Sequence, residues 1–267
     1  MTTSAIENKL LASSGLLDEP HFRRLIKFQT RRREALVGTE LDIRTTVTHV
    51  LSSEAAADVW FTVYCMHIRR VADTRVDAGD QWVLKKRYSE LEVFRRLLLK
   101  RIAYWEYTVR REFTRKTTID CRKAPNKPEV IQERAVGLPN FVRELLGVYT
   151  DLAVYKTNIR LQAGGFASSW AQLCTIFSEL ETFLEVPQPQ KDAEIQRQSA
   201  VLALKDFHEL DEDAHGELCS ICLNEDPATD EARPVVSLPC DHHFHEDCVI
   251  DWFSTSTTCP LCRRSSH

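Results

Sequence analysis

Six of the nine cysteines in this 267-residue chain lie between residues 219 and 262, and histidines stand among them. The spacing is Cys219-x2-Cys222-x17-Cys240-x-His242-x2-His245-x2-Cys248-x10-Cys259-x2-Cys262. Thiolates and imidazoles at such spacings are the ligands that structural zinc takes, four to each ion. Eight ligands therefore predict two Zn2+ ions. His243 stands between ligands, and we expect it not to coordinate.

The predicted zinc ions have a structural role, because all four positions on each ion would be filled by the protein. A segment this short cannot bury enough apolar area to fold alone, so metal binding would supply much of its folding free energy. We expect it to unfold without zinc.

The segments CSICLNE, LPCDHHFHEDCVIDWF and TCPLCRR resemble a RING finger of the two-histidine type, over about residues 215 to 265. The resemblance implies a cross-brace, in which ligands of the two ions alternate along the chain. One ion would be held by Cys219, Cys222, His245 and Cys248, and the other by Cys240, His242, Cys259 and Cys262.

RING fingers of this type generally act as ubiquitin ligases that bind a ubiquitin-charged conjugating enzyme. The resemblance places the conjugating-enzyme surface at Ile221, Trp252, Pro260 and Leu261. Large apolar side chains in a module with almost no core also favour an interface. Packing on the zinc-bound loops is the structural alternative for Ile221 and Trp252.

Arg263 matches the family's linchpin arginine, which contacts both the conjugating enzyme and ubiquitin. A guanidinium can donate to both and hold the donor ubiquitin in a geometry suited to attack on its thioester. The resemblance therefore implies positional catalysis, with the reactive cysteine on the partner. We expect Arg264 to be a solvated charge.

The residues before this module change pattern twice. β-Branched and aromatic residues between Leu41 and Tyr88, interrupted by two turn-like stretches, predict three antiparallel strands in a meander. Apolar residues at helical spacing then predict helices in YSELEVFRRLLLKRIAYW, EVIQERAVGLPNFVRELLGVY and SSWAQLCTIFSELETFLEV. Strands followed by helices predict an α+β domain with helices packed on a small sheet.

Basic residues are concentrated in this domain. Between Lys85 and Arg134 there are 15 Lys and Arg against 7 Asp and Glu, although the whole chain has a net charge of −4. Arg87 and Tyr88 stand where the third strand gives way to a helix. Charge and ring stacking there suit a phosphorylated ring, whereas an exposed strand end with a core tyrosine is the structural alternative.

The meander, the RYSEL junction and the later VIQERAVGLPNFV segment together resemble a phox-homology (PX) domain over about residues 38 to 187. The resemblance implies binding of phosphatidylinositol 3-phosphate. Arg87 would pair with the 3-phosphate, Tyr88 would lie under the inositol ring and Arg134 would bind ring hydroxyls. Lys116 aligns with the lysine for the 1-phosphate, and Lys123 and Lys127 compete for that role. The segment DCRKAPNKPEV replaces the family's membrane loop and has little apolar character.

We therefore expect an α+β chain, in which a PX-like domain (a small antiparallel sheet plus helices) is joined by a linker to a small two-zinc cross-brace RING finger. The predicted divisions are an N-terminal basic segment, 1–37, the PX-like domain, 38–187, an acidic linker, 188–214, and the zinc module, 215–267. HFRRLIKFQTRRREAL in the first segment predicts a basic amphipathic helix, packed on the next domain or serving a membrane or partner role.

The N-terminus lacks the continuous apolar stretch of a secretory signal. The longest uncharged stretch, 161–178, is too polar to cross a bilayer. We expect a cytoplasmic protein, peripheral on endosomal membranes. Nucleic acid is disfavoured as a partner, because the zinc pattern is not the finger that enters the major groove.

Two hypotheses follow. The first is a RING-type ubiquitin ligase recruited to membranes through phosphatidylinositol 3-phosphate, with a conjugating enzyme and ubiquitin as partners. The second is a phosphoinositide-binding sorting adaptor whose zinc module only docks proteins. Ile221, Trp252, Pro260 and Arg263 together favour the first, since a pure scaffold would not need that set.

Overall fold

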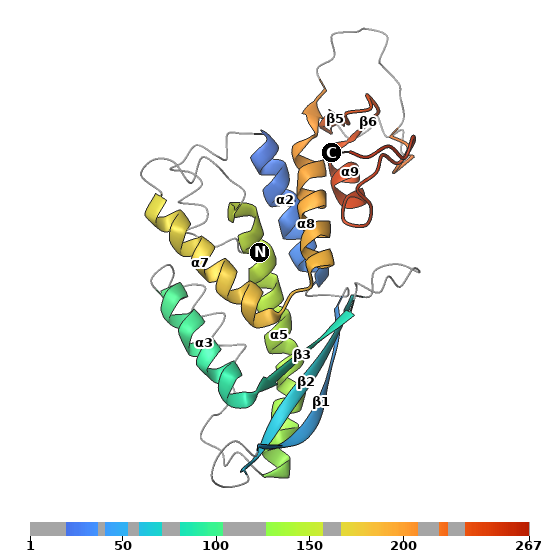
Figure 1. Ribbon diagram of the computed structural model, residues 1–267. Coiled ribbons are helices and arrows are strands. Elements are labelled where there is room, and N and C mark those ends of the chain that lie inside the picture. The colour runs from blue at the N-terminus through green and yellow to red at the C-terminus, as the bar shows by residue number, and fades with distance from the viewer. Residues whose placement is uncertain are drawn as a thin grey trace. The chain divides into compact units, whose positions relative to one another are not determined.

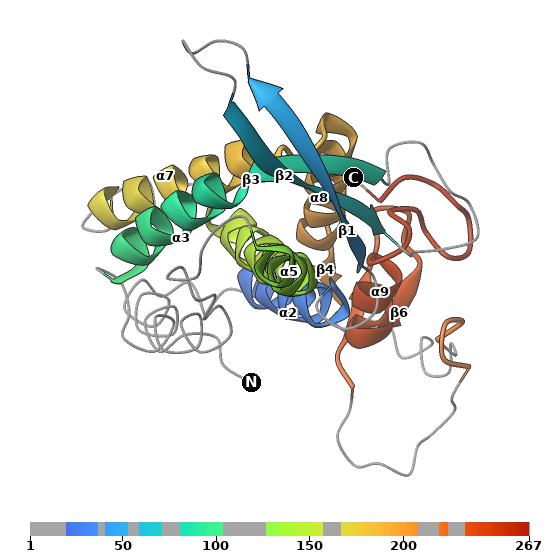
Figure 2. The same cartoon turned by 90° about the horizontal axis from the view of Figure 1, so that it is seen from below.

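The computed structural model describes residues 20–36, 41–52, 59–70, 81–103, 127–156, 167–207, 219–223 and 233–266 (Figures 1 and 2). The described residues form two compact units. The first comprises residues 33–187, and the second comprises residues 20–32 together with residues 188–266.

The sheet of the first unit is the predicted meander. Strands β1 (Leu41–Ser52), β2 (Val59–Arg70) and β3 (Gln81–Arg87) pair antiparallel in the order β1-β2-β3. Leu41 lies opposite Arg70, and Val63 lies opposite Arg87. Buried Tyr64, Met66 and Ile68 alternate along β2, so one face of the strand turns to the core.

Three helices follow this sheet: α3 (Tyr88–Ala103), α5 (Pro128–Lys156) and α7 (Ala167–Leu184). Helix α5 packs on β1 and β2 and also contacts α7, and α3 runs beside α7 (Figure 2). Leu91, Phe94 and Leu98 of the predicted stripe in α3 are buried. They join a core in which Leu84, Leu138, Val142, Leu145, Leu180 and Leu184 are fully enclosed. The predicted α+β order of elements is confirmed here.

Among the described residues, two helices outside the zinc module belong to the second unit. Helix α2 (Pro20–Ala35) lies in it up to Arg32, and α8 (Gln188–Leu202) lies wholly within it. The apolar stripe of α2 is buried at Phe22, Leu25 and Phe28. The amide of Gln29 donates to the Glu194 carboxylate at 2.8 Å, which joins α2 to α8.

The zinc module completes the second unit. It has two short strands, β5 (Val235–Ser237) and β6 (His243–His245), and one helix, α9 (Glu246–Trp252). Strand β4 (Lys205–Asp206), immediately after α8, pairs with β5 and widens the hairpin to three strands. The buried residues of this small core include Val236, Leu238, Phe244, Val249, Ile250 and Phe253.

The compact units divide the chain differently from the predicted domains in one respect. Residues 20–32 and the helical part of the predicted acidic linker group with the zinc module. The physical reason is a set of ion pairs and a β-pairing that reach far along the sequence. None of the described helices combines the length and apolar character needed to cross a lipid bilayer.

Candidate functional site

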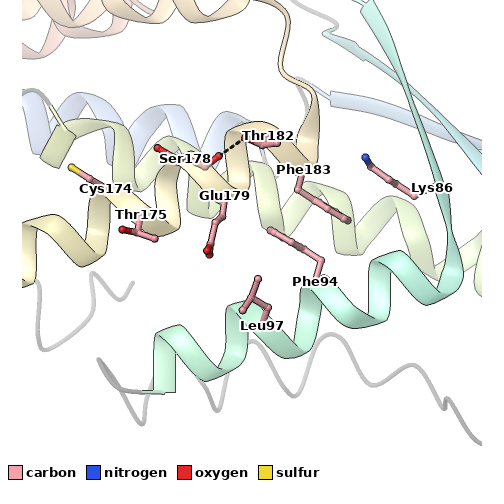
Figure 3. A pocket seen from close by; sticks show the side chains of 9 residues that line it. All are labelled: Lys86, Phe94, Leu97, Cys174, Thr175, Ser178, Glu179, Thr182 and Phe183. Carbon is pink, nitrogen blue, oxygen red and sulfur yellow. Dashed lines mark hydrogen bonds between the residues drawn. The ribbon is translucent and has the colours of Figure 1, made fainter.

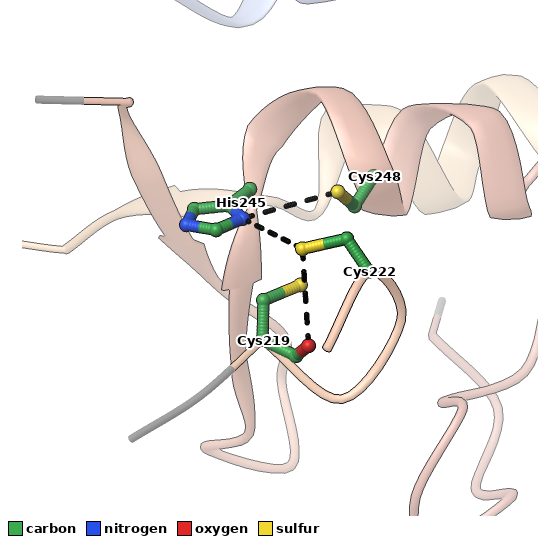
Figure 4. A group of neighbouring side chains, drawn as sticks. All are labelled: Cys219, Cys222, His245 and Cys248. Carbon is green, nitrogen blue, oxygen red and sulfur yellow. Dashed lines mark hydrogen bonds between the residues drawn. The ribbon is translucent and has the colours of Figure 1, made fainter. Parts of the chain in front are cut away.

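The first group of predicted zinc ligands lies at the start of α9. His245 ends β6, Cys248 lies in the first turn of the helix, and Cys219 and Cys222 come from a separate knuckle (Figure 4). His245 Nδ1 lies 3.4 Å from Cys222 Sγ and 3.9 Å from Cys248 Sγ. All four ligand atoms lie within 4.8 Å of one another.

The second group joins the hairpin to the C-terminal knuckle. It consists of Cys240, His242, Cys259 and Cys262. His242 Nδ1 lies 3.3 Å from Cys240 Sγ and 3.7 Å from Cys259 Sγ. His243 belongs to neither group, and its ring instead packs edge-on against Phe207, with 4.3 Å between the ring centroids. The structure thus brings together the same two sets of four that the resemblance implies.

These distances fit zinc. Bonds of about 2.3 Å to sulfur and 2.0–2.1 Å to nitrogen at tetrahedral angles place neighbouring ligand atoms about 3.5 to 3.8 Å apart. Burial and the neighbouring Cys219 raise the pKa of the Cys248 thiol to about 12. Burial, with Cys259 and Cys262 close by, raises the pKa of Cys240 to about 11. Thiols packed so tightly become thiolates together only around a cation. Two structural zinc ions therefore complete this module.

The two CxxC knuckles share one backbone geometry. Leu223 follows Cys222 and has φ 52°, and Arg263 follows Cys262 and has φ 58°. Each donates its backbone N–H to the carbonyl of the first cysteine in its knuckle, at 2.9 Å for Leu223 and 3.0 Å for Arg263. This tight turn is what brings both thiols of a knuckle to one ion.

The predicted conjugating-enzyme residues lie around these knuckles. Leu261 is 53% exposed, and Ile221, Trp252 and Pro260 are partly exposed. The indole N–H of Trp252 donates to the carbonyl of Thr258 at 2.7 Å, which ties α9 to the last knuckle. Arg263 is exposed, as a residue that contacts partners must be.

Sequence reasoning missed Leu223. Its side chain is 73% exposed, the largest exposed fraction among the large apolar residues of the described chain. The available signal was its place after Cys222, which matches the place of Arg263 after Cys262. An exposed leucine in a turn with positive φ has no packing role among the described residues, and its exposure suits contact with a partner.

The predicted lipid-binding residues lie in the first unit. The Arg134 guanidinium stacks over the ring of Tyr88, with 3.7 Å between its carbon and the ring centroid. The guanidinium of Arg87 lies over the Phe61 ring at 3.4 Å, and its backbone N–H donates to Glu90 at 2.6 Å. The structure therefore brings Tyr88 and Arg134 together, and places Arg87 next to them in the chain. Lys116 and Lys123 lie outside the described residues.

Arg134 is unusually placed for a cation. Its side chain is buried, and its Nε has no hydrogen-bond partner among the described residues. The neighbouring Tyr64 hydroxyl is also buried; this burial raises the pKa of Tyr64, and Arg134 partly opposes the rise. A buried guanidinium with unused donor capacity is suited to an anionic ligand.

A groove between α3 and α7 was not anticipated. It has a volume of about 680 Å³ and is lined by Phe94, Leu97 and Phe183, with Lys86 at one end (Figure 3). Phe94 and Phe183 stack with 3.7 Å between ring centroids. The sequence offered only the apolar stripe of α3, which predicts core packing.

Comparison with known proteins places residues 217–263 in the family described as the Ring finger domain. The E3 ubiquitin-protein ligase RNF181 homolog of Drosophila melanogaster is 34% identical over 93 residues, which are 34% of this chain and 56% of that protein. The putative RING-H2 finger protein ATL69 of Arabidopsis thaliana is 51% identical over 47 residues, 18% of this chain and 28% of that protein.

The E3 ubiquitin-protein ligase RLIM of Mus musculus is 38% identical over 64 residues, 24% of this chain and 10% of that protein. The chain thus covers from a tenth to just over half of these relatives. No solved structure gave a significant match. What the comparisons establish is a Ring finger domain at residues 217–263, with the two zinc groups of the structure inside it.

Proposed function

We propose that this protein is a RING-type E3 ubiquitin ligase that binds a ubiquitin-charged conjugating enzyme and positions its thioester for attack. The observation that carries the proposal is the Trp252–Thr258 hydrogen bond, which links the tryptophan expected at the conjugating-enzyme surface to the knuckle of Pro260, Leu261 and Arg263. Several of the similar proteins are named E3 ubiquitin-protein ligases.

The chemistry requires no covalent intermediate on this chain. A lysine amine of the substrate attacks the thioester carbonyl, a C–N bond forms, the C–S bond breaks, the amine proton is lost to solvent, and the thiolate leaves on the conjugating enzyme. Arg263 would hold ubiquitin against the conjugating enzyme so that the carbonyl stays accessible. The zinc ions keep the contact residues in place.

The test is discharge of ubiquitin from charged conjugating enzymes onto free lysine. We expect the wild-type protein to accelerate discharge and Arg263→Ala to remove most of the acceleration. Arg264→Ala is the matched control, because Arg264 is the adjacent exposed arginine and its backbone carbonyl, which the substitution keeps, accepts the hydrogen bond from the Cys259 N–H. Folded, zinc-loaded protein that stimulates no member of a broad panel would refute the ligase and leave a docking adaptor.

We further propose that the first unit binds phosphatidylinositol 3-phosphate and recruits the ligase to endosomal membranes. The support is the buried Arg134 stacked on Tyr88 beside the exposed Arg87. Arg87 would pair with the 3-phosphate and Arg134 with ring hydroxyls, and Lys116 would be the candidate for the 1-phosphate. A single copy should bind weakly and in a salt-sensitive manner.

Vesicle co-sedimentation tests this recruitment. We expect binding to vesicles that contain phosphatidylinositol 3-phosphate, reduced binding to vesicles with equal charge from phosphatidylserine, and loss of the difference in Arg87→Gln. The matched control is Arg96→Gln, an exposed arginine of α3 that pairs with Glu92. Equal binding to both vesicle types by the wild-type protein would contradict the lipid specificity.

A further inference from the structure

A row of basic side chains on α2 faces an acidic row on the zinc-module helix α9. Both rows lie in the second unit. Lys27 Nζ lies 3.1 Å from a Glu246 oxygen and 2.5 Å from an Asp247 oxygen. Arg31 pairs with Asp247 and, at 2.6 Å, with Asp251. The partners follow one another in the same order along both helices.

Arg24 anchors the start of this row. Its side chain is 2% exposed and pairs with Asp206 of β4 and, at 2.9 Å, with Glu246 of α9. It also donates to the carbonyl of Leu204 at 3.3 Å. Burying a guanidinium is costly unless its donors are used, and the donors of Arg24 reach β4, α9 and the carbonyl of Leu204, so this arginine fixes α2, β4 and α9 with respect to one another. The apolar stripe of α2, at Phe22, Leu25 and Phe28, is buried as well.

The row continues to the residue before Trp252. Arg31 donates to the backbone carbonyl of Asp247 at 3.0 Å and to the Asp251 carboxylate. Helix α9 has only seven residues, and its zinc ligand, Cys248, lies in its first turn. Zinc therefore holds the start of the helix, and Arg31 contacts the end from which Trp252 projects.

We propose that Arg24, Lys27 and Arg31 of α2 are positioning residues for the ligase, because they set the orientation of α9 and hence of Trp252. The working ligase module then consists of residues 20–32 and 188–266. This inference rests on the proposed ligase function. Helix α2, near residue 30, thus influences how well the conjugating enzyme binds at Trp252, which lies more than 200 residues later in the chain.

Arg31→Glu in the full-length chain is the informative variant. Arg31 is partly exposed, so the fold and both zinc ions should be retained, whereas Arg24 is too buried for a clean test. The new carboxylate faces Asp247 and Asp251 and repels them, which disturbs the orientation of α9 and Trp252. We therefore expect the KM for the ubiquitin-charged conjugating enzyme to rise about tenfold. The kcat of discharge should change little, because Arg263 is untouched.

Two controls separate positioning from general damage. Arg23→Glu makes the same charge change at an exposed position of the same helix and should leave KM unchanged. Asp251→Arg, added to Arg31→Glu, recreates an ion pair and should recover part of the lost affinity. Backbone amide exchange at Val249–Phe253 should be faster in Arg31→Glu, while exchange at Val235–Ser237 should be unchanged.

The outcomes distinguish the two proposals. A wild-type protein that stimulates no discharge overturns the ligase function and this inference with it. A wild-type protein that is active, with Arg31→Glu indistinguishable from Arg23→Glu in KM and in amide exchange, overturns this inference alone. A rise in KM that the added Asp251→Arg partly reverses, at unchanged zinc content, supports it.

Discussion

The indole nitrogen of Trp252 lies 2.7 Å from the carbonyl oxygen of Thr258, the residue before the zinc ligand Cys259. This hydrogen bond joins the end of α9, near the first zinc group, to the knuckle of the second. The aromatic side chain is thus oriented by both metal groups at once. Its position is consequently sensitive to both zinc sites.

Trp252→Phe keeps the apolar ring and removes the hydrogen bond. We expect it to lower the free energy of unfolding of the zinc module by about 1 kcal/mol, the usual net contribution of one hydrogen bond. Trp252→Ala also removes the contact area and should reduce ubiquitin discharge by about tenfold or more. Thermal unfolding and discharge rates measure the two effects. Equal discharge by the alanine variant and the wild type would contradict the assigned interface.

A substitution of Leu223 should change the affinity for the conjugating enzyme without lowering the stability of the protein. Asparagine tolerates its positive φ well, so Leu223→Asn should leave the melting temperature unchanged or slightly raised. We expect weaker binding of the conjugating enzyme, measured by calorimetry, because an exposed apolar contact is lost. Leu202→Asn, at an exposed position of α8, is the control for loss of a surface leucine. Unchanged affinity in Leu223→Asn would remove this residue from the interface.

Zinc removal should unfold the zinc module while the meander of the first unit persists. Chelation is expected to release two zinc ions per chain and to abolish protection of amides in β5 and α9, whereas those in β2 stay protected. Cys248→Ser should lower the zinc content, and Cys174→Ser, at a cysteine outside both groups, should not. Persistent protection of α9 in metal-free protein would contradict the structural role of the ions.

Zinc affinity should fall as the solution becomes more acidic. Without metal the module is unfolded, and cysteine thiols at their ordinary pKa of about 8.5 are mostly protonated at neutral pH. Each proton displaced by zinc contributes about a tenfold loss of affinity per unit decrease in pH. Competition with a chromophoric chelator between about pH 6 and 8 measures this slope. A pH-independent affinity would be inconsistent with thiolate ligation.

The first unit should lose stability in alkaline solution through Tyr64. Burial raises the pKa of Tyr64 in the folded state. The contribution of Tyr64 to the free energy of unfolding is therefore fully present below the pKa of the unfolded chain, 10.0, and is lost as pH rises through the folded pKa. Tyr64→Phe should remove this part of the alkaline loss, as followed by urea unfolding at pH values on both sides of 10. If the free energy of unfolding depends on pH in the same way in Tyr64→Phe and in the wild type, Tyr64 is not the cause of the alkaline loss.

Local features were predictable from the sequence, and distant ones were not. The ligand spacing around Cys219 and Cys259 and the alternation along β2 each lie within a few residues, so the zinc groups and the meander could be predicted. The role of α2 could not, because Arg24 and Glu246 are 222 residues apart, and a basic helix has many possible acidic partners. The stack of Arg134 on Tyr88 likewise depends on how α5 packs on the sheet. The phosphoinositide role of these residues stays a prediction.

The second unit is discontinuous in sequence, with residues 33–187 inserted between α2 and α8. Because a ribosome releases the chain from its N-terminus onward, α2 emerges early and lacks its contacts with the rest of the second unit until α8 and α9 have been made. During that interval the apolar side chains of α2, Phe22, Leu25 and Phe28, cannot pack against the later half of the second unit. The nascent chain therefore exposes the apolar stripe of α2 during this interval, and the second unit is complete only after the last knuckle has been synthesised.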